Sequence, residues 1–211
     1  MPMALRSMWL PPDPAPLPAA TAALLADARG RIDRWFAQPG RIAGQGSIPS
    51  DHELVYRALR TLRREQPELR SFLEWGSGFG VVTALAAQLG FGAHGIEYDA
   101  ALVAGAHDLL TAHGVRASFV VGSFVPPGSD ARLDAAELET RTVLRSDDAY
   151  DRLERDLDDF EVVFAYPWPD EEGLYRRLFA QHADFGAVLV TYSRLEGVRA
   201  YRKVAGKGRA G

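Results

Sequence analysis

Short apolar runs alternate with longer amphipathic stretches along the chain from residue 70 onward. The apolar runs predict strands at residues 71–75, 92–97, 116–121, 160–166 and 186–192. The amphipathic stretches predict helices at residues 79–89, 99–113, 147–158 and 170–182. Strands that alternate with helices of this length need crossover connections, so the pattern predicts an α/β fold with a doubly wound, mainly parallel sheet.

Two further amphipathic segments precede this region and predict an N-terminal helical extension. Apolar residues recur at helical spacing over residues 19–37, and Gly30 leaves open whether they form one helix or two shorter ones. Ser50 and Glu53 have the spacing of a capping box, which predicts that a second helix begins there. Pro67 is expected to end that helix.

The domain organisation follows from these elements. Residues 1–18 are rich in proline and predict a flexible, irregular arm. We expect one domain over residues 19–204, with a helical lead-in at 19–69 and an α/β core at 70–204, and a tail at 205–211. Residues 126–146 fit either an extended surface segment or one short helix, and one last strand is expected near residues 198–204.

Composition excludes several classes of function. The 211 residues carry a formal net charge of −4, which argues against a protein held on nucleic acid by a broad basic surface. No apolar run approaches the roughly 18–20 residues that span a bilayer. The chain has no cysteine, and its five histidines show no metal-binding spacing, so we expect no metal site. These features fit a cytoplasmic protein, and its oligomeric state stays open.

The stretch "FLEWGSGFG", residues 72–80, carries the strongest chemical signal. It lies between the first predicted strand of the core and the following helix, at the carboxyl edge of the sheet where parallel sheets bind ligands. Glycines at 76, 78 and 80 let the backbone bend sharply and approach a ligand closely. About 20 residues later, "HGIEYD" ends the second strand with Glu97, which can accept hydrogen bonds from both hydroxyls of a ribose. The pattern therefore predicts a nucleoside ligand.

These segments together resemble the class I S-adenosylmethionine-dependent methyltransferases. "EWGSGFG" is similar to their first motif, "GIEYD" to their second-strand acid, and "VVGSF" and "VVFAYPWP" to the ends of their third and fourth strands. The resemblance covers about residues 50–192 in the expected order. It implies a Rossmann-like methyltransferase fold and S-adenosyl-L-methionine as the cofactor.

The expected cofactor site combines this resemblance with the chemistry of the residues. Glu74 would supply negative charge near the ammonium of the cofactor's amino-acid tail, and the glycine loop would leave the tail room. The resemblance places the adenine beside the end of the third strand. The expected cofactor-binding residues are Glu74, Gly76, Ser77, Gly78, Gly80, Glu97, Tyr98, Ser123 and Phe124.

An NAD(P)-dependent oxidoreductase is the first alternative. Its fingerprint, G-x-G-x-x-G/A, requires a small residue where this chain has Val81, and here the third glycine comes one position early. A carboxylate at Glu74 would also repel a pyrophosphate. Both observations favour the methyl donor.

The segment "AYPWPDEE", residues 165–172, is the candidate acceptor site. Tyr166 and Trp168 can hold a cation on their ring faces, although a packed strand-to-helix turn would explain the same residues. Glu171, beside Glu172 and Tyr166, is a candidate to help deprotonate an amine. Many amino-methylating relatives carry an amide or acid followed by Pro-Pro-aromatic here, whereas this chain begins with Ala165, which argues against amine specificity.

The methyl acceptor and even the activity stay open. "IPSDHELVYRAL" is loosely similar to the lead-in segment of non-SET protein-lysine methyltransferases, so a protein lysine amine and a small molecule are both candidate acceptors. The family normally finishes its sheet with two antiparallel strands, and the C-terminal region has room for about one. A non-catalytic S-adenosylmethionine-binding partner of an active subunit is therefore the second alternative.

Overall fold

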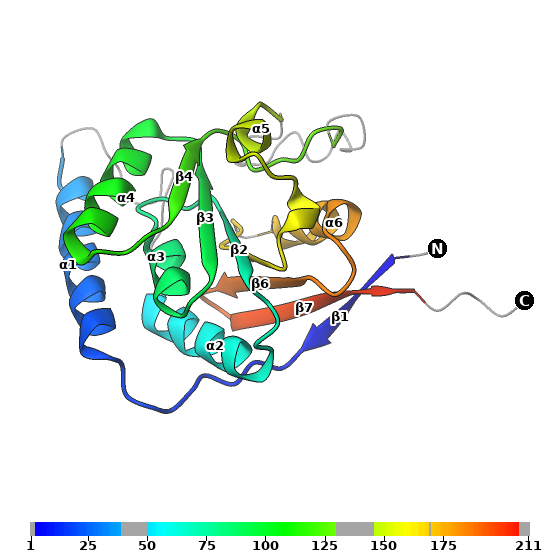
Figure 1. Cartoon of the computed structure of the whole chain (residues 1–211), viewed down its shortest axis with the longest axis horizontal. Coiled ribbons are helices and arrows are strands. Elements are labelled where there is room, and N and C mark those ends of the chain that lie inside the picture. The colour runs from blue at the N-terminus through cyan, green and yellow to red at the C-terminus, as the bar shows by residue number, and fades with distance from the viewer. Residues whose placement is uncertain (1–2, 39–49, 130–145, 169, 207–211) are drawn as a thin grey trace, which may run out of the picture.

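A seven-stranded sheet runs through the molecule in the order β1-β7-β6-β5-β2-β3-β4 (Figure 1). The computed structural model describes residues 3–38, 50–129, 146–168 and 170–206. The strands are β1 (Met3–Met8), β2 (Ser71–Trp75), β3 (Gly92–Glu97), β4 (Ser118–Val121), β5 (Val162–Ala165), β6 (Val188–Ser193) and β7 (Gly197–Ala205). Strands β2 to β6 pair in parallel, while β7 is antiparallel to β6 and β1 is antiparallel to β7. The predicted α/β fold with a mainly parallel sheet is confirmed.

Helices cover both faces of this sheet (Figure 1). They are α1 (Ala19–Phe36), α2 (His52–Glu65), α3 (Val81–Gln88), α4 (Ala100–His113), α5 (Ala149–Leu153) and α6 (Glu172–His182). Helices α2 and α3 share one hydrophobic cluster with the sheet, and α5 and α6 share another. Helix α1 packs outside α3 and α4 in a third cluster.

Side-chain alternation along the strands explains why both faces are apolar. In β2, Phe72 packs into the α2–α3 cluster, whereas Leu73 packs into the α5–α6 cluster. Val162 and Val163 of β5 divide in the same way. Parallel strands covered on both faces have near-continuous apolar sequences, which is the pattern that located them.

The expected irregular arm is wrong for residues 3–8. These residues form β1 and pair with β7, from Met3 opposite Ala205 to Met8 opposite Ala200. Apart from Pro2, the prolines that suggested an irregular arm begin at Pro11, beyond the strand. Because the partner strand lies almost 200 residues away in sequence, local patterning could not indicate the pairing. Strand β1 fills the outer position that the C-terminal region leaves vacant, so the sheet is complete.

The structure decides one open point about α1 and corrects the predicted cap of α2. Helix α1 is continuous through Gly30, because its apolar stripe packs on α3 and α4 and outweighs the propensity cost of about 1 kcal/mol. The cap of α2 is Asp51, whose Oδ1 accepts from the Leu54 N–H at 3.0 Å, and not Ser50. Glu53 instead bonds Arg57 one turn later at 2.8 Å.

The helix expected at 147–158 is divided. Helix α5 ends where Glu154 takes a left-handed conformation with φ of 54°. A 3₁₀ turn at Leu157–Asp159 follows, and Asp156 and Asp159 form its reciprocal capping box. The segment at 126–146 lies largely outside the described residues.

Candidate functional site

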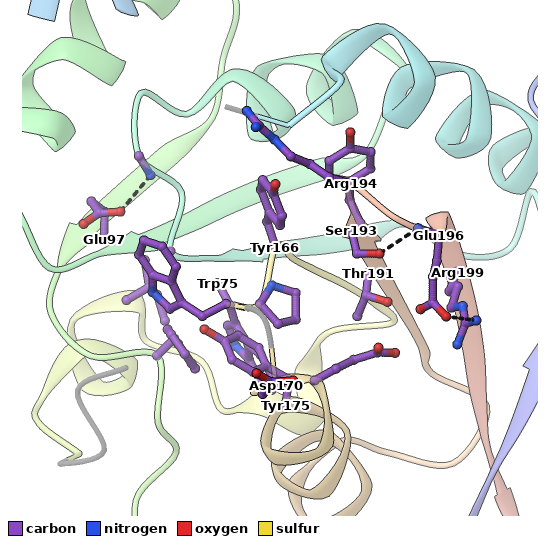
Figure 2. A pocket seen from close by; sticks show the side chains of 18 of the residues that line it. Trp75, Glu97, Tyr166, Asp170, Tyr175, Thr191, Ser193, Arg194, Glu196 and Arg199 are labelled. Carbon is purple, nitrogen blue, oxygen red and sulfur yellow. Dashed lines mark hydrogen bonds and ion pairs between the residues drawn. The ribbon is translucent and has the colours of Figure 1, made fainter. Parts of the chain in front are cut away.

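A cavity of about 450 Å³ opens at the carboxyl edge of the sheet (Figure 2). It extends from the ends of β2, β3 and β4 to the end of β5 and the turn that joins β6 to β7. Parallel sheets bind ligands at this edge, and small-molecule sites have volumes of about 300–1,000 Å³. The predicted glycine loop, second-strand acid and fourth-strand segment therefore meet in one place.

The three loop glycines have different roles. All adopt left-handed conformations, with φ of 68° at Gly76, 53° at Gly78 and 65° at Gly80. Gly76 and Gly78 line the cavity, and a Cβ on Gly76 would meet no atom within 4 Å. A Cβ on Gly80 would lie 2.3 Å from the Phe119 ring. Gly80 is therefore required for packing of α3 against β4, whereas Gly76 and Gly78 keep backbone open to a ligand.

Glu97 lies where the ribose was predicted. One of its oxygens accepts the backbone N–H of Gly78 at 2.8 Å, and the other accepts that of Asp99 at 3.0 Å. Burial raises the pKa of the Glu97 carboxyl above its ordinary value, and these backbone hydrogen bonds oppose the shift. Each carboxylate oxygen can accept a second hydrogen bond, so the group can still receive ligand hydroxyls. Tyr98 beside it is 63% exposed at the rim of the cavity.

Glu74 is turned beneath the glycine loop and does not line the large cavity. Its Oε2 accepts from the Thr83 backbone N–H at 2.7 Å and from the Thr83 hydroxyl at 2.6 Å. The carboxyl thus caps α3, whose N-cap residue is Gly80 and has no side chain to do so. Burial raises the pKa of Glu74 to about 8. In the protein without ligand this group is therefore largely protonated at neutral pH, and its predicted contact with an ammonium stays a prediction.

A second, small cavity of about 60 Å³ lies under the loop and adjoins the large one. Glu74, Ser77 and His52 line it, and Gly76, Gly78 and Tyr166 border both cavities. The buried Ser77 hydroxyl has no hydrogen-bond partner among the described residues. Burial lowers the pKa of His52 to about 4, so its imidazole is neutral at pH 7. This polar recess can receive a small charged or hydrogen-bonding group.

The end of β4 forms an aromatic wall. The Phe124 ring stacks on Trp75 with centroids 5.2 Å apart and an interplanar angle of 19°. Ser123 lies beside it and is buried, with its backbone N–H donated to Asp147 at 2.8 Å. Both predicted residues line the cavity, and Phe124 also packs against the α5–α6 cluster. Phe124 thus belongs partly to the core, and its predicted contact with the adenine stays a prediction.

The fourth-strand segment enters the other half of the cavity. Tyr166 and Trp168 both line it, and the Tyr166 ring meets that of Tyr192 edge-on at 5.0 Å. Burial raises the pKa of the Tyr166 phenol, and a hydrogen bond with the Arg194 side chain acts in the opposite direction. Tyr166 therefore remains a phenol at neutral pH, and its predicted part in deprotonating an amine stays a prediction.

Glu171 does not line the cavity. It is buried, only 7% exposed, and its backbone N–H donates to Trp168 O at 3.0 Å just before α6 begins. Its neighbours Asp170 and Glu172 line the cavity instead. The strand-to-helix turn rotates the chain, so the carboxylates on either side of Glu171 face the site.

Sequence reasoning missed one whole wall of the site. Trp75, directly before the glycine loop, donates its indole N–H to the Tyr150 hydroxyl at 3.1 Å and forms the cavity floor. The turn between β6 and β7, with Thr191 to Gly197 and Arg199, closes the far end. The carboxyl end of every parallel strand is a candidate site position, and this rule would have indicated the end of β6.

Comparisons with solved structures identify the fold that holds this cavity. A methyltransferase from Geobacter sulfurreducens is similar, with a TM-score of 0.53 and 13% identity over 89% of this chain and 92% of that one. An RNA methyltransferase from Salinibacter ruber, in complex with S-adenosyl-L-homocysteine, has a TM-score of 0.50 and 20% identity over 78% of this chain and 98% of that one. The chain therefore has the Rossmann-like fold of class I S-adenosylmethionine-dependent methyltransferases. No family model matches the sequence, and no curated protein is significantly similar to it.

Proposed function

We propose that this protein is an S-adenosylmethionine-dependent methyltransferase. The observation that carries the proposal is the meeting of Glu97, the open glycine loop and the unpartnered Ser77 hydroxyl around two adjoining cavities. A nucleoside fits the large cavity beside Glu97, and an amino-acid tail fits the polar recess under the loop. The solved structure of the Salinibacter ruber methyltransferase, with S-adenosyl-L-homocysteine bound, supports the same ligand class.

The chain's own residues supply positioning. Glu97 would accept the ribose hydroxyls, and Ser77 with the free Glu74 oxygen would hold the amino-acid tail. Phe124 and Ser123 would flank the base. S-adenosylmethionine, when bound, supplies a methyl group on a sulfonium, and transfer of that group is an in-line displacement. Alignment of the acceptor and exclusion of water by Tyr166 and Trp168 would then contribute most of the acceleration.

The two alternatives have less support. The non-catalytic reading depended on an incomplete sheet, and β1 completes it. The oxidoreductase reading needs a pyrophosphate at the loop, where Val81 begins α3 and the recess beneath carries Glu74. A protein side chain and a small molecule are both candidate methyl acceptors. No helix within the described ranges is long and apolar enough to cross a membrane, and a cytoplasmic location stays a prediction.

Calorimetry tests the proposal directly. We expect S-adenosylmethionine and S-adenosylhomocysteine to bind in about the micromolar range, and NAD and NADP not to bind. Tighter binding of a nicotinamide cofactor would contradict the proposal. A negative result with all four ligands would contradict it as well.

A further inference from the structure

The half of the cavity beyond Tyr166 is lined by a hydroxyl group, that of Thr191. Thr191, at the end of β6, is 3% exposed and lines the cavity, and no described residue hydrogen-bonds its hydroxyl. Figure 2 shows Thr191 on the wall between Tyr166 and Glu196. Because Thr191 lines the cavity, its hydroxyl can exchange hydrogen bonds with a ligand there.

Two carboxylates face the same half of the cavity. Asp170 lines it in a left-handed conformation, with φ of 73°, and has no ion pair with any described residue. Glu172 lines it from the first turn of α6, and its Oε1 accepts the Tyr201 hydroxyl at 2.9 Å and lies 4.0 Å from Arg176 Nε. Non-glycine residues in this backbone region cluster at functional sites.

The positive groups of this wall are already engaged. Arg199 is ion-paired with Glu196 across the β6–β7 turn. Arg194 hydrogen-bonds the Tyr166 hydroxyl, and Figure 2 shows it at the opposite side of the cavity from Asp170. The Asp170 carboxylate and the Thr191 hydroxyl are two polar groups of the cavity that have no hydrogen bond or ion pair with a described residue.

Aromatic side chains in this half of the cavity also favour a positively charged ligand. Tyr166, Trp168 and Tyr175 all line it. Ring faces attract cations by about 0.5–2 kcal/mol, and carboxylates repel anions. A ligand suited to this surface brings positive charge and several hydrogen-bond donors.

Although Ala165 replaces the amide or acid of the amino-methylating relatives, we propose that the methyl acceptor is an aliphatic primary amine, bound as its ammonium by Asp170, Glu172 and the Thr191 hydroxyl in place of that group. The inference rests on the proposed methyl transfer. The ammonium first gives one proton to a facing carboxylate, which releases it to solvent through the mouth of the cavity. The amine nitrogen then forms a bond to the methyl carbon as the carbon–sulfur bond breaks. The electron pair of that bond goes to sulfur, so the products are a methylated ammonium and a neutral thioether.

The acceptor preference is tested with matched four-carbon probes. Butylamine, butanol and butyrate are titrated into the protein saturated with S-adenosylhomocysteine, and each is then assayed for methyl transfer with S-adenosylmethionine. We expect butylamine to bind at least tenfold more tightly than the other two and to be the probe methylated. A lysine-containing peptide forms a parallel arm: preference for the peptide identifies a protein side chain, and preference for butylamine identifies a free amine.

Three variants locate the subsite. Asp170→Asn, Glu172→Gln and Thr191→Val should each weaken amine binding by about tenfold while cofactor affinity and melting temperature stay unchanged. Asp108→Asn, on the exposed face of α4, is the matched control and should change nothing.

Equal or stronger binding of butanol or butyrate would overturn the amine assignment alone, provided the cofactor binds. Unchanged amine binding in all three variants would also overturn it. Failure of the cofactor itself to bind would overturn both this inference and the proposed function.

Discussion

The Glu97 carboxylate accepts a hydrogen bond from the Gly78 backbone N–H at 2.8 Å. This bond joins the end of β3 to the glycine loop that follows β2. The acid therefore does two things at once: it holds the loop open and presents oxygen atoms to the cavity. Loss of the carboxylate removes a ligand contact and also releases the loop.

We expect Glu97→Ala to weaken S-adenosylmethionine binding by tenfold or more, because hydrogen bonds to a charged group are worth about 1.5–3 kcal/mol each. Calorimetry measures the change, and thermal unfolding checks the fold. Asp108→Asn, at an exposed position of α4, is the control for loss of a carboxylate away from the cavity. Normal cofactor affinity in a folded Glu97→Ala protein would show that the Glu97 carboxylate does not bind the cofactor.

A matched pair of glycine substitutions separates binding from packing. Gly76 and Gly80 have nearly equal φ, 68° and 65°, so an added Cβ strains both backbones by a similar 1–2 kcal/mol. At Gly80 the Cβ would also collide with Phe119, which adds about 1–3 kcal/mol of overpacking. We expect Gly80→Ala to unfold at lower denaturant concentration than Gly76→Ala.

Gly76→Ala should keep more stability but bind cofactor less well, since its methyl group enters space that the ligand uses. Denaturant titration and calorimetry on the same two proteins give both readouts. Equal stability losses, or normal cofactor affinity in Gly76→Ala, would show that the loop has another role.

The parallel core was predictable because its signals are local. Strands β2, β3, β5 and β6 are short runs of mostly apolar residues, and turn residues and a helix follow β2, β3 and β5. Strand β1 was not predictable, since its pairing with β7 depends on residues at the far end of the chain. The helix expected at 147–158 failed because Glu154 reverses its backbone conformation, which no propensity indicates.

The candidate site was predictable where backbone geometry fixes it. Gly76, Gly78 and Glu97 were found from spacing alone, and all line the cavity. The directions in which side chains point could not be predicted from spacing. Glu74 points under the loop and Glu171 points into the protein, and both facts depend on how the turns after β2 and β5 rotate the chain.

Strand β1 should contribute measurably to stability. Leu5 is half-buried against the α5–α6 cluster, while Arg6 on the opposite face is exposed. Leu5→Ala should therefore cost about 1–2 kcal/mol of unfolding free energy, about half of the value for a fully buried leucine. Arg6→Ala in the same strand should change it by less than about 0.5 kcal/mol. Urea unfolding compares them, and equal effects would mean that β1 adds little to the fold.

Tyr166 should matter for the acceptor more than for the cofactor. Its ring lies at the junction of the two cavities, so Tyr166→Ala should slow methyl transfer while cofactor affinity stays within a few-fold. Tyr166→Phe keeps the edge-on contact with Tyr192 and removes only the hydroxyl that Arg194 bonds. The two variants thus separate ring from hydroxyl. Intact turnover with a stability loss of several kcal/mol would assign the ring to the core.

Glu74 should make the stability of the ligand-free protein fall as pH rises. Burial raises its pKa from 4.5 to about 8, so the folded protein binds this proton more tightly than the unfolded chain does. The stabilisation from the protonated carboxyl is complete below about pH 4.5 and is lost as pH rises toward 8. Within that window this group alone changes the unfolding free energy by up to about 1.4 kcal/mol per pH unit.

Glu74→Gln isolates this contribution, because glutamine cannot ionise and its carbonyl can still accept from Thr83. Urea unfolding of both proteins at pH 5, 6, 7 and 8 gives the difference in unfolding free energy at each pH. All other titrating groups are common to the two chains and cancel in that difference. We expect the glutamine variant to gain stability relative to the parent protein with each step in pH. A difference that stays constant from pH 5 to 8 would mean that the Glu74 carboxyl is already ionised beneath the loop, where it could attract an ammonium at neutral pH.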